Sequence, residues 1–292
     1  MAYMNGNQYI LMTAAKNEEE YIGETIKSVT SQNIKPFLWI IVSDGSTDKT
    51  DDIIKNYANK FNFIKYVRNE NTDERNFASK VHSLNIAIKQ ITNIEYDFIG
   101  ILDADAVFEK NYYESLLNEF QKNEKLGLTG GIFYEEYKGK KIKVIQSKNS
   151  VRGAVQFFRK NCFEDIGDLV PLENGGEDII TEVTARMKGW EVESFDYLKV
   201  ENLRLSGLGR WGIIETKFRE GMLAHSIGYH PIFQIVKSLY RLKERPYIAA
   251  GLLHLFGYFW AVIGNNKVKV LEDFKSYLRK EQMQRLKEML SF

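Results

Sequence analysis

The chain has 292 residues, 44% of them hydrophobic and 27% charged, and its formal net charge is +1. This composition is ordinary for a soluble globular protein and excludes a disordered chain, while the near balance of charge gives no support to an extended nucleic-acid surface. The single cysteine, Cys162, excludes an internal disulfide and a multi-cysteine metal site and suits a reducing compartment. We expect Cys162 to be packed and inert. No basic stretch precedes an apolar run near the first residue, so we expect no signal peptide.

The first half of the chain alternates short apolar runs with helical patterns, which is typical of βαβ units and a parallel sheet. Strands are expected over residues 9–14, 37–42, 61–67 and 98–102. A helix follows each of the first three strands, and the third of these helices is expected over residues 74–91. The pattern predicts an α/β fold with a mostly parallel central sheet flanked by helices.

The strict alternation fades after residue 105. We expect a helix over 112–122, strands over 126–134 and 142–147, and a helix that opens near residue 175 and runs to 187. Gly189 is a plausible stop for that helix, ahead of a strand over 190–195. No repeat or low-complexity linker interrupts this region, so residues 1–205 are expected to form one domain.

Residues 206–292 read as a helical extension rich in aromatic and basic residues, with helical patterns broken at Pro231 and Pro246. Phe233, Val236 and Tyr240 fall on one helical face, with Lys237 on an adjoining stripe. Such a helix suits an anionic membrane surface, and it equally suits packing on a neighbouring domain or a second copy of the chain. Residues 247–263 are nearly uncharged but at the lower limit of length for a membrane span, which favours a buried or interfacial helix. Peripheral membrane contact through 232–263 is therefore one expectation for this region, and a homo-oligomer contact is another.

Polar clusters follow three of the predicted strands, at residues 15–18, 44–46 and 103–105. The carboxyl ends of parallel strands form the edge at which open α/β sheets bind ligands. Residues i and i+2 of a strand point to the same side, so Asp103 and Asp105 are expected to project together and to share a divalent cation, which in turn suits a diphosphate. Asp44 offers a carboxylate to a base or ribose, and Gly45 permits close approach of the backbone. Each cluster alone is consistent with an ordinary turn, whereas the three together indicate a nucleotide site.

The chain resembles the family 2 glycosyltransferases, which have the GT-A fold and usually transfer a sugar from a nucleotide donor with inversion. The resemblance covers roughly residues 8–200 and rests on motifs that occur in the family's order. They are Thr13-Ala14-Ala15-Lys16-Asn17-Glu18-Glu19, the loop Ser43-Asp44-Gly45-Ser46, the helix Lys80-Val81-His82-Ser83-Leu84-Asn85, the metal motif Asp103-Ala104-Asp105, and Gly176-Glu177-Asp178.

The resemblance also implies roles for individual residues. Those that line the donor nucleotide site are Thr13, Ala14, Glu18, Asp44, Arg75, Lys80 and Asp103. Asp105, with Asp103, would hold Mn²⁺ or Mg²⁺. Asp178 would be the base that takes the acceptor proton, with Glu177 as its rival, although both acids also suit an ordinary helix N-terminus.

One departure from the family bears on processivity. Processive polysaccharide synthases carry Gln-x-x-Arg-Trp, and here Gly207 stands where Gln is usual, ahead of Arg210 and Trp211. This difference favours transfer of a single sugar. The tail at 221–231 is similar to that of transferases that make surface glycans, where the acceptor is often lipid-linked. Arg210, Trp211, His225 and His230 are therefore acceptor-side candidates, although a lone Trp usually packs and a His beside a Pro often caps a helix.

The leading interpretation is a metal-dependent inverting glycosyltransferase that uses a nucleotide sugar, UDP-linked by preference, and acts on a glycan or lipid-linked acceptor in the cytoplasm or at the cytoplasmic face of the membrane. Two alternatives stay open. One is a nucleotidyltransferase on a related sheet, although the first strand is not followed by a Gly-rich triphosphate loop. The other is a catalytically silent glycan-binding protein.

Overall fold

The structure is a computed structural model, and it describes residues 7–70, 77–137, 139–172, 175–204, 212–244, 246–266 and 268–291. The chain divides into two compact units, Met1–Arg204 and Leu205–Phe292. The first unit is built on one mixed sheet, and the second consists of helices.

The sheet of the first unit has a parallel half and a mixed half. The parallel half contains β3 (Ile64–Asn69), β2 (Leu38–Asp44), β1 (Tyr9–Ala15) and β4 (Phe98–Ile101), in that spatial order. The sheet continues through β8 (Phe157–Arg159), β6 (Leu126–Tyr137), β9 (Glu191–Asn202) and β5 (Ala106–Phe108), while β7 (Lys140–Lys143) pairs with β6. β4 and β8 are antiparallel, as are β8 and β6, whereas β6 and β9 are parallel. The predicted α/β class is confirmed.

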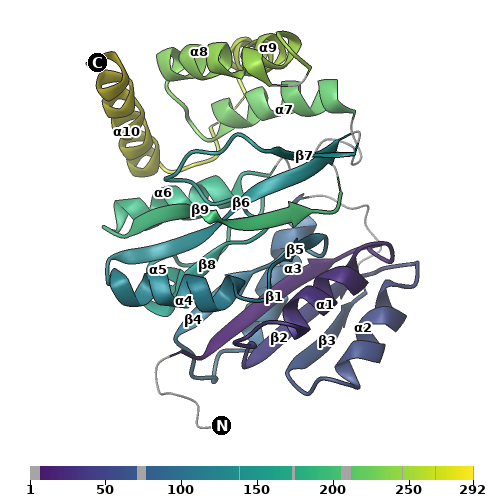
Figure 1. Ribbon diagram of the computed structural model, residues 1–292. Helices are drawn as coiled ribbons and strands as arrows, with labels where there is room; N and C mark the ends of the chain where they lie inside the picture. The colour runs from purple at the N-terminus through teal and green to yellow at the C-terminus, as the bar shows by residue number, and fades with distance from the viewer. Residues whose placement is uncertain are drawn as a thin grey trace. The chain divides into compact units, whose positions relative to one another are not determined.

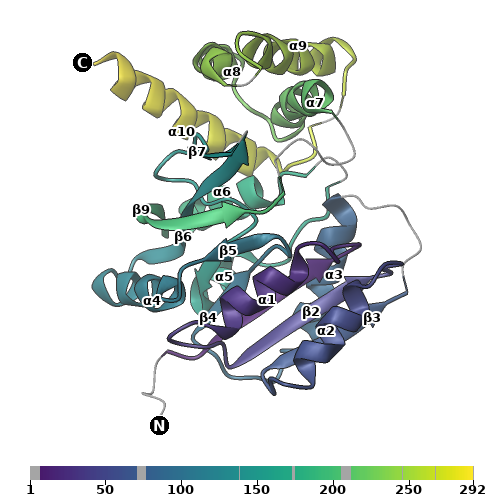
Figure 2. The same cartoon turned by 45° about the vertical axis from the view of Figure 1, so that its right-hand side comes forward.

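Helices cover both faces of this sheet (Figures 1 and 2). The helices α1 (Ile22–Thr30), α2 (Thr50–Ala58) and α4 (Tyr112–Lys122) pack on the face to which Leu11, Trp39 and Ile41 point. The opposite face, with Ile10, Met12 and Ile40, is covered by α3 (Phe77–Lys89), α5 (Lys160–Ile166) and α6 (Glu177–Met187). Because successive strand residues point to opposite faces, burial on both sides explains the continuous apolar runs of the parallel strands.

Several short elements differ from the prediction. β5, β8 and α5 are absent from the predicted elements, and β7 ends at Lys143 instead of continuing to residue 147. Three-residue strands carry too little periodicity to be recognised, because they exist only through pairing with distant strands such as β9 and β4. β9 is longer than expected and extends to Asn202, and its last residue pairs with Ala106 of β5.

The second unit contains α7 (Ile213–Ser226), α8 (Pro231–Tyr240), the 3₁₀ turn η1 (Arg241–Lys243), α9 (Ala249–Ile263) and α10 (Glu272–Leu290). Pro231 occupies the first turn of α8, where the missing N–H of a proline costs no hydrogen bond, and Pro246 lies between η1 and α9. In the described part of the chain, none of the helices has the length and apolar character needed to span a bilayer.

Candidate active site

The loops after β1 and β2 are joined by reciprocal hydrogen bonds. Asn17 adopts a left-handed backbone conformation (φ 53°), which asparagine tolerates, and its Oδ1 accepts the backbone N–H of Thr47 at 2.8 Å. The backbone N–H of Glu18 donates to Thr50 Oγ1 at 2.7 Å. The Asn17-Glu18 segment is therefore fixed against the Asp44-Gly45-Ser46 loop, and two of the three predicted clusters lie together.

Asp44 ends β2, and its side chain is buried among polar groups. Asn69 Nδ2 donates to Asp44 Oδ1 at 2.7 Å, and Lys16 Nζ lies 3.7 Å from Asp44 Oδ2. Gly45 follows with φ 66°, a conformation that glycine adopts without strain. The carboxylate is held in one orientation at the sheet edge, between residues from β1 and β3.

Thr13 and Ala14 belong to β1, the strand that pairs with β2 and its terminal Asp44. Thr13 is fully buried, and its Oγ1 accepts the indole N–H of Trp39 at 3.0 Å, while Ala14 is half-buried. The Thr13 hydroxyl therefore orients a core tryptophan, and Ala14 is the member of the pair with exposed surface.

Asp103 and Asp105 lie in a turn between β4 and β5, so the expectation that they project together from an extended strand is wrong. β4 ends at Ile101, because the chain must reverse to pair β5 with β9. The turn is held through its backbone. Thr25 Oγ1 donates to the carbonyl of Ala104 at 2.8 Å, and the N–H of Leu203 donates to the carbonyl of Asp105 at 2.8 Å.

Each of these aspartates contacts a different basic side chain. Lys80 Nζ lies 2.7 Å from Asp103 Oδ1 and 3.6 Å from Glu177 Oε1. Arg204 Nη2 lies 2.5 Å from Glu18 Oε2, and its Nε lies 3.7 Å from Asp105 Oδ2. Two cation-bridged clusters thus connect the β1 loop, the Asp103-Asp105 turn and the start of α6.

The electrostatics of Lys80 follow from these contacts. Burial disfavours its charged form, but Asp103 and Glu177 outweigh that penalty, and the pKa of Lys80 lies well above the ordinary lysine value. Lys80 therefore stays protonated and acts as a fixed positive charge near the side chains of Asp103, Glu177 and Asp178.

Asp103 and Asp105 are the carboxylates available to a divalent cation at this edge of the sheet. No cluster of three or more His, Cys, Asp or Glu side chains with suitable geometry occurs among the described residues. Mg²⁺ and Mn²⁺ accept oxygen ligands, and Mg²⁺ is commonly held by one or two carboxylates together with substrate phosphates and water. Asp103 and Asp105 fit that mode, in which the substrate completes the site.

The Glu177-Asp178 pair opens α6 after two glycines in left-handed conformations, Gly175 (φ 79°) and Gly176 (φ 98°). Burial raises the pKa of Glu177, against the opposing effect of Lys80. Asp178 is half-buried. Its Oδ1 accepts the backbone N–H of Ile179 at 2.8 Å, and its Oδ2 accepts that of Gly153 at 3.3 Å. Of the two acids, Asp178 is the more exposed residue.

The segment 151–156 links α6 to Asp103. Glu182 Oε2 accepts the backbone N–H of Val151 at 3.1 Å, and Gln156 Nε2 donates to Thr181 Oγ1 at 3.0 Å. The backbone N–H of Asp103 donates to the carbonyl of Ala154 at 2.9 Å. Burial raises the pKa of Glu182 to about 7. The position of the acidic pair relative to Asp103 is thus set through this segment.

The acceptor-side candidates have structural partners where they are described. His225 Nε2 lies 2.9 Å from the carbonyl of Asn266, and His230 caps α8 by accepting the N–H of Ile232 at its Nδ1. Arg75, Arg210 and Trp211 lie outside the described residues.

Sequence reasoning did not select Arg204, Asn69 or Gly153 as site residues. Arg204 follows a strand in no recognisable motif, and Asn69 ends β3 in a polar stretch typical of a loop. Gly153 contributes only backbone groups to the site, which leave no side-chain signal. Only the fold brings these three residues to the acidic clusters.

Comparison with known proteins identifies the family. The sequence model described as "Glycosyl transferase family 2" matches residues 11–172, more than half of the chain. The chain belongs to glycosyl transferase family 2. It is therefore a glycosyltransferase, and the resemblance noted from its motifs is confirmed.

Curated relatives include two bacterial synthases. The poly-beta-1,6-N-acetyl-D-glucosamine synthase of Staphylococcus epidermidis is 30% identical over 206 residues, which cover 64% of this chain and 46% of the relative. That of Staphylococcus aureus is 25% identical over 250 residues, which cover 78% of this chain and 57% of the relative. The chain thus spans about half the length of the curated relatives that it matches.

Solved structures with the same fold include a mannosyltransferase from Pyrobaculum calidifontis in complex with GDP-Man and Mn²⁺. Its TM-score is 0.56 at 15% identity, with 95% of this chain and 84% of that chain covered. TarS from S. aureus in complex with UDP-GlcNAc gives 0.54 at 15% identity, with 93% and 78% covered. At these identities the likeness establishes a GT-A-like fold.

Proposed function

We propose that the first unit is the catalytic domain, that it transfers one sugar from a nucleotide-sugar donor with inversion, and that a divalent cation assists. The observation that carries this proposal is the meeting of the predicted nucleotide, metal and base residues at one edge of the sheet. Lys80 joins Asp103 to Glu177, and Arg204 joins Glu18 to Asp105.

In this proposal Asp44 receives the nucleotide base or ribose, because its carboxylate is pre-oriented by Asn69 and Lys16. Asp105, with Asp103, would hold Mn²⁺ or Mg²⁺. The cation, when bound, would neutralise the charge that develops on the leaving diphosphate. The neighbours of known structure that bind GDP-Man or UDP-GlcNAc support a nucleotide-sugar donor, and a UDP-sugar is the first to test.

Asp178 is the proposed base. Displacement at the anomeric carbon requires that the acceptor hydroxyl lose its proton as it attacks, and a carboxylate must reach that hydroxyl. Asp178 is half-buried, whereas Glu177 is buried against Lys80. We therefore assign Asp178 to proton removal and Glu177 to the positioning of Lys80.

We propose a glycan or lipid-linked acceptor, processed in polysaccharide or glycoconjugate synthesis in the cytoplasm or at the cytoplasmic membrane face. The curated relatives are named as polysaccharide synthases, which supports the glycan class. Gly207, at the position of the Gln in the processive motif, favours the addition of a single sugar by this chain.

The test is a panel of nucleotide sugars incubated with the full chain and Mn²⁺ or Mg²⁺, with nucleoside diphosphate release as the readout. We expect metal-dependent hydrolysis of one donor. Asp178→Asn should abolish hydrolysis and leave donor binding intact, while Glu177→Gln should retain part of it. If the chain bound a nucleotide sugar but hydrolysed none of the panel, a catalytically silent glycan-binding protein would be supported. Release of pyrophosphate from a nucleoside triphosphate would support a nucleotidyltransferase. Either result would overturn the proposal.

A further inference from the structure

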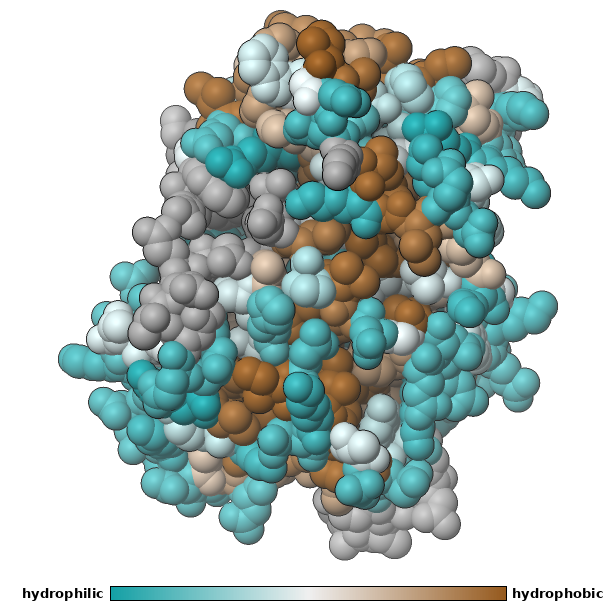
Figure 3. Space-filling model, turned by 180° about the vertical axis from the view of Figure 1, so that it is seen from behind, coloured by the Kyte–Doolittle hydropathy of each residue, from teal (hydrophilic) through white to brown (hydrophobic). Residues whose placement is uncertain are grey.

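The helices α8 and α9 carry exposed stripes of large apolar side chains. These side chains recur every three or four residues, so each stripe occupies one face of its helix. They are 38% (Ile235) to 83% (Ile263) exposed. The members are Ile232, Ile235 and Leu239 of α8, and Leu252, Phe256, Trp260 and Ile263 of α9. Figure 3 shows hydrophobic side chains gathered over these two helices, at the top of the view. We call the two stripes together the apolar face.

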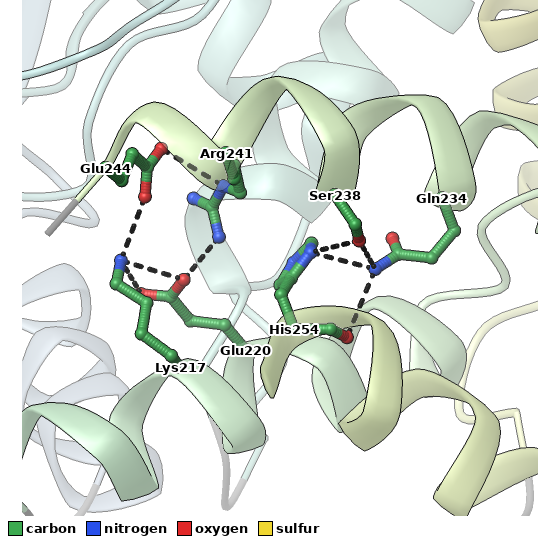
Figure 4. A network of polar contacts seen from close by, with 7 residues as sticks. All are labelled: Lys217, Glu220, Gln234, Ser238, Arg241, Glu244 and His254. Atoms are coloured by element: carbon green, nitrogen blue, oxygen red, sulfur yellow. Dashed lines mark hydrogen bonds and ion pairs between the residues drawn. The ribbon is translucent and has the colours of Figure 1, made fainter. Parts of the chain in front are cut away.

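The polar side chains of the same helices point inward. Gln234, Ser238 and His254 are buried and hydrogen-bonded to one another (Figure 4). His254 Nδ1 lies 2.9 Å from Gln234 Nε2 and 3.0 Å from Ser238 Oγ. A helix that packs in water normally buries its apolar stripe and exposes its polar residues, and α8 does the reverse. Of the three residues expected on one helical face, Phe233 and Val236 are half-buried and Tyr240 is exposed.

Small residues allow α9 to pack closely against its neighbours. A Cβ on Gly251 would lie 2.3 Å from the carbonyl oxygen of Ser238, and one on Gly257 would lie 2.0 Å from that of Phe218. Small residues at the helix contacts and large apolar residues on the outside are typical of helices that face lipid. In the turn before α9, Ile248 has a left-handed conformation (φ 65°), unfavourable for a β-branched residue, and its side chain is exposed.

Basic residues outnumber acidic residues in the segment that carries the apolar face. The only acidic residue between positions 231 and 266 is Glu244, and it lies 3.2 Å from both Lys217 Nζ and Arg241 Nε (Figure 4). Arg241 also pairs with Glu220. Lys243 remains exposed, with its ammonium group 5.3 Å from the ring centre of Tyr240. Glu244 is thus neutralised within the helical unit, and Lys243 is an exposed positive charge next to Tyr240, which complements anionic lipid headgroups.

The length of α9 sets the mode of contact. Its 15 residues span about 22 Å, less than the roughly 30 Å of a hydrocarbon core. A protein partner would need polar groups to pair with, since protein interfaces carry about one hydrogen bond per 100–200 Å². The stripes offer only the indole N–H of Trp260, and indole rings favour the headgroup boundary of a bilayer.

We propose that the apolar face of α8 and α9 is an interfacial membrane-binding surface that lies in the plane of an anionic bilayer, with Leu252, Phe256 and Trp260 among the acyl chains and Lys243 at the headgroups. This surface would bind anionic bilayers whichever sugar the catalytic unit transfers. Membrane binding and donor hydrolysis are therefore separable, and either can fail without the other.

The experiment is flotation of the full chain with vesicles of phosphatidylcholine containing about 30 mol % phosphatidylglycerol. We expect the wild type to float, and Phe256→Ser/Trp260→Ser to bind at least about tenfold more weakly. Pure phosphatidylcholine or raised salt should weaken wild-type binding. The matched control is Ile145→Ser/Val170→Ser, which removes two exposed apolar side chains from the other unit and should float like the wild type.

A second measurement is direct and does not depend on a drop in binding. Brominated acyl chains should quench Trp260 fluorescence in the wild type, and the quenched component should be missing in Trp260→Phe. Equal flotation of the wild type and the double variant, or absence of quenching, would overturn the proposal. Dimers of the wild type in light scattering that dissociate in the double variant, without flotation, would instead identify the face as a contact between two copies.

Discussion

The ammonium group of Lys80 lies 2.7 Å from the carboxylate of Asp103, the first aspartate of Asp103-Ala104-Asp105. Glu177 is the next acid, 3.6 Å away, and Lys80 also approaches the carbonyl oxygen of Gly153 at 3.4 Å. One positive charge on α3 therefore holds together the Asp103 turn, the start of α6 and the segment that positions Asp178.

Replacing Lys80 by Met should lower both stability and activity. Asp103 and Glu177 would face each other without their shared cation, so we expect a loss of about 2 kcal/mol in the free energy of unfolding, measured in urea. Donor hydrolysis should fall at least about a hundredfold, because the acidic side chains would no longer be held in position. Lys89→Met, an exposed position on the same helix, is the matched control. If Lys80→Met hydrolysed the donor at the wild-type rate, the contacts of Lys80 with Asp103 and Glu177 would have no catalytic importance.

Arg204 should compete with the divalent cation. Its guanidinium contacts Glu18 and Asp105 and stacks 5.0 Å from the ring centre of Tyr21. Removal of this charge leaves Asp105 more available to a metal, so Arg204→Met should bind Mn²⁺ about tenfold more tightly in the absence of nucleotide, by calorimetry. Turnover should nevertheless fall, because Glu18 loses its partner.

A charge-matched control distinguishes a local effect of Arg204 from a general change in net charge. Arg219→Met removes an arginine that pairs with Glu215 on α7, in the other unit. Its Mn²⁺ affinity should equal that of the wild type. If Arg204→Met bound Mn²⁺ no more tightly than Arg219→Met, competition at Asp105 would be excluded.

The long elements of the fold can be predicted from sequence because their patterns are local. β1 and β2 read as strands from apolar runs that end in polar turns, and α1 reads as a helix from Ile22, Ile26 and Val29. β5 and β8 cannot be predicted in this way, since three residues have no measurable period and their pairing partners lie far away in sequence. The turn at Asp103-Asp105 follows from that same distant pairing.

The site residues also fall into two groups, those recognisable from sequence motifs and those placed only by tertiary contacts. Glu18, Asp44 and Asp103 stand in motifs at or just after β1, β2 and β4, and the carboxyl ends of these parallel strands bring them to one edge. Glu177 also stands in a motif, but it opens α6 and meets that edge through its contact with Lys80. The pairing of each acid with a particular base depends on tertiary contacts between segments as distant as Glu18 and Arg204. The inward orientation of Gln234 and Ser238 likewise cannot be predicted from the sequence, because an amphipathic pattern does not show which face of a helix packs against the protein.

The stability of the second unit should depend on pH through His254. Burial, reinforced by Arg241 and Lys237, lowers the pKa of His254 to about 2, from the ordinary value of 6.5. Below pH 6.5 the unfolded chain binds a proton that the folded chain does not, so the free energy of unfolding should fall with decreasing pH, by about 1.4 kcal/mol per pH unit. Urea unfolding followed through helical circular dichroism measures the difference in this slope between the wild type and a His254 variant, because Glu182 of the first unit, with its pKa raised to about 7, contributes a slope of opposite sign to both.

Between pH 6.5 and about 5 the slope of the second unit should come from His254, because Glu220, whose pKa is lowered by Arg241 and Lys217 against its burial, adds to it only in the more acidic range. His254→Gln cannot take up a proton and should flatten the slope below pH 6.5. His82→Gln, at an exposed position of α3, should leave it unchanged. Identical slopes for the wild type and His254→Gln would contradict the assignment.

Gly153 should be required for its small size beside Asp178. A Cβ at this position would lie 3.0 Å from the Cβ of Asp178 and 3.4 Å from its Oδ2, so Gly153→Ala must displace the proposed base or its hydrogen-bond partner. A displacement of this kind should lower turnover at least about tenfold while donor affinity stays unchanged. Gly23→Ala is the control, because its Cβ would meet only Ile53, at 3.9 Å, and alanine suits a helix. Wild-type turnover in Gly153→Ala would mean that Asp178 need not keep its present position, and loss of donor affinity would place Gly153 on the donor side instead.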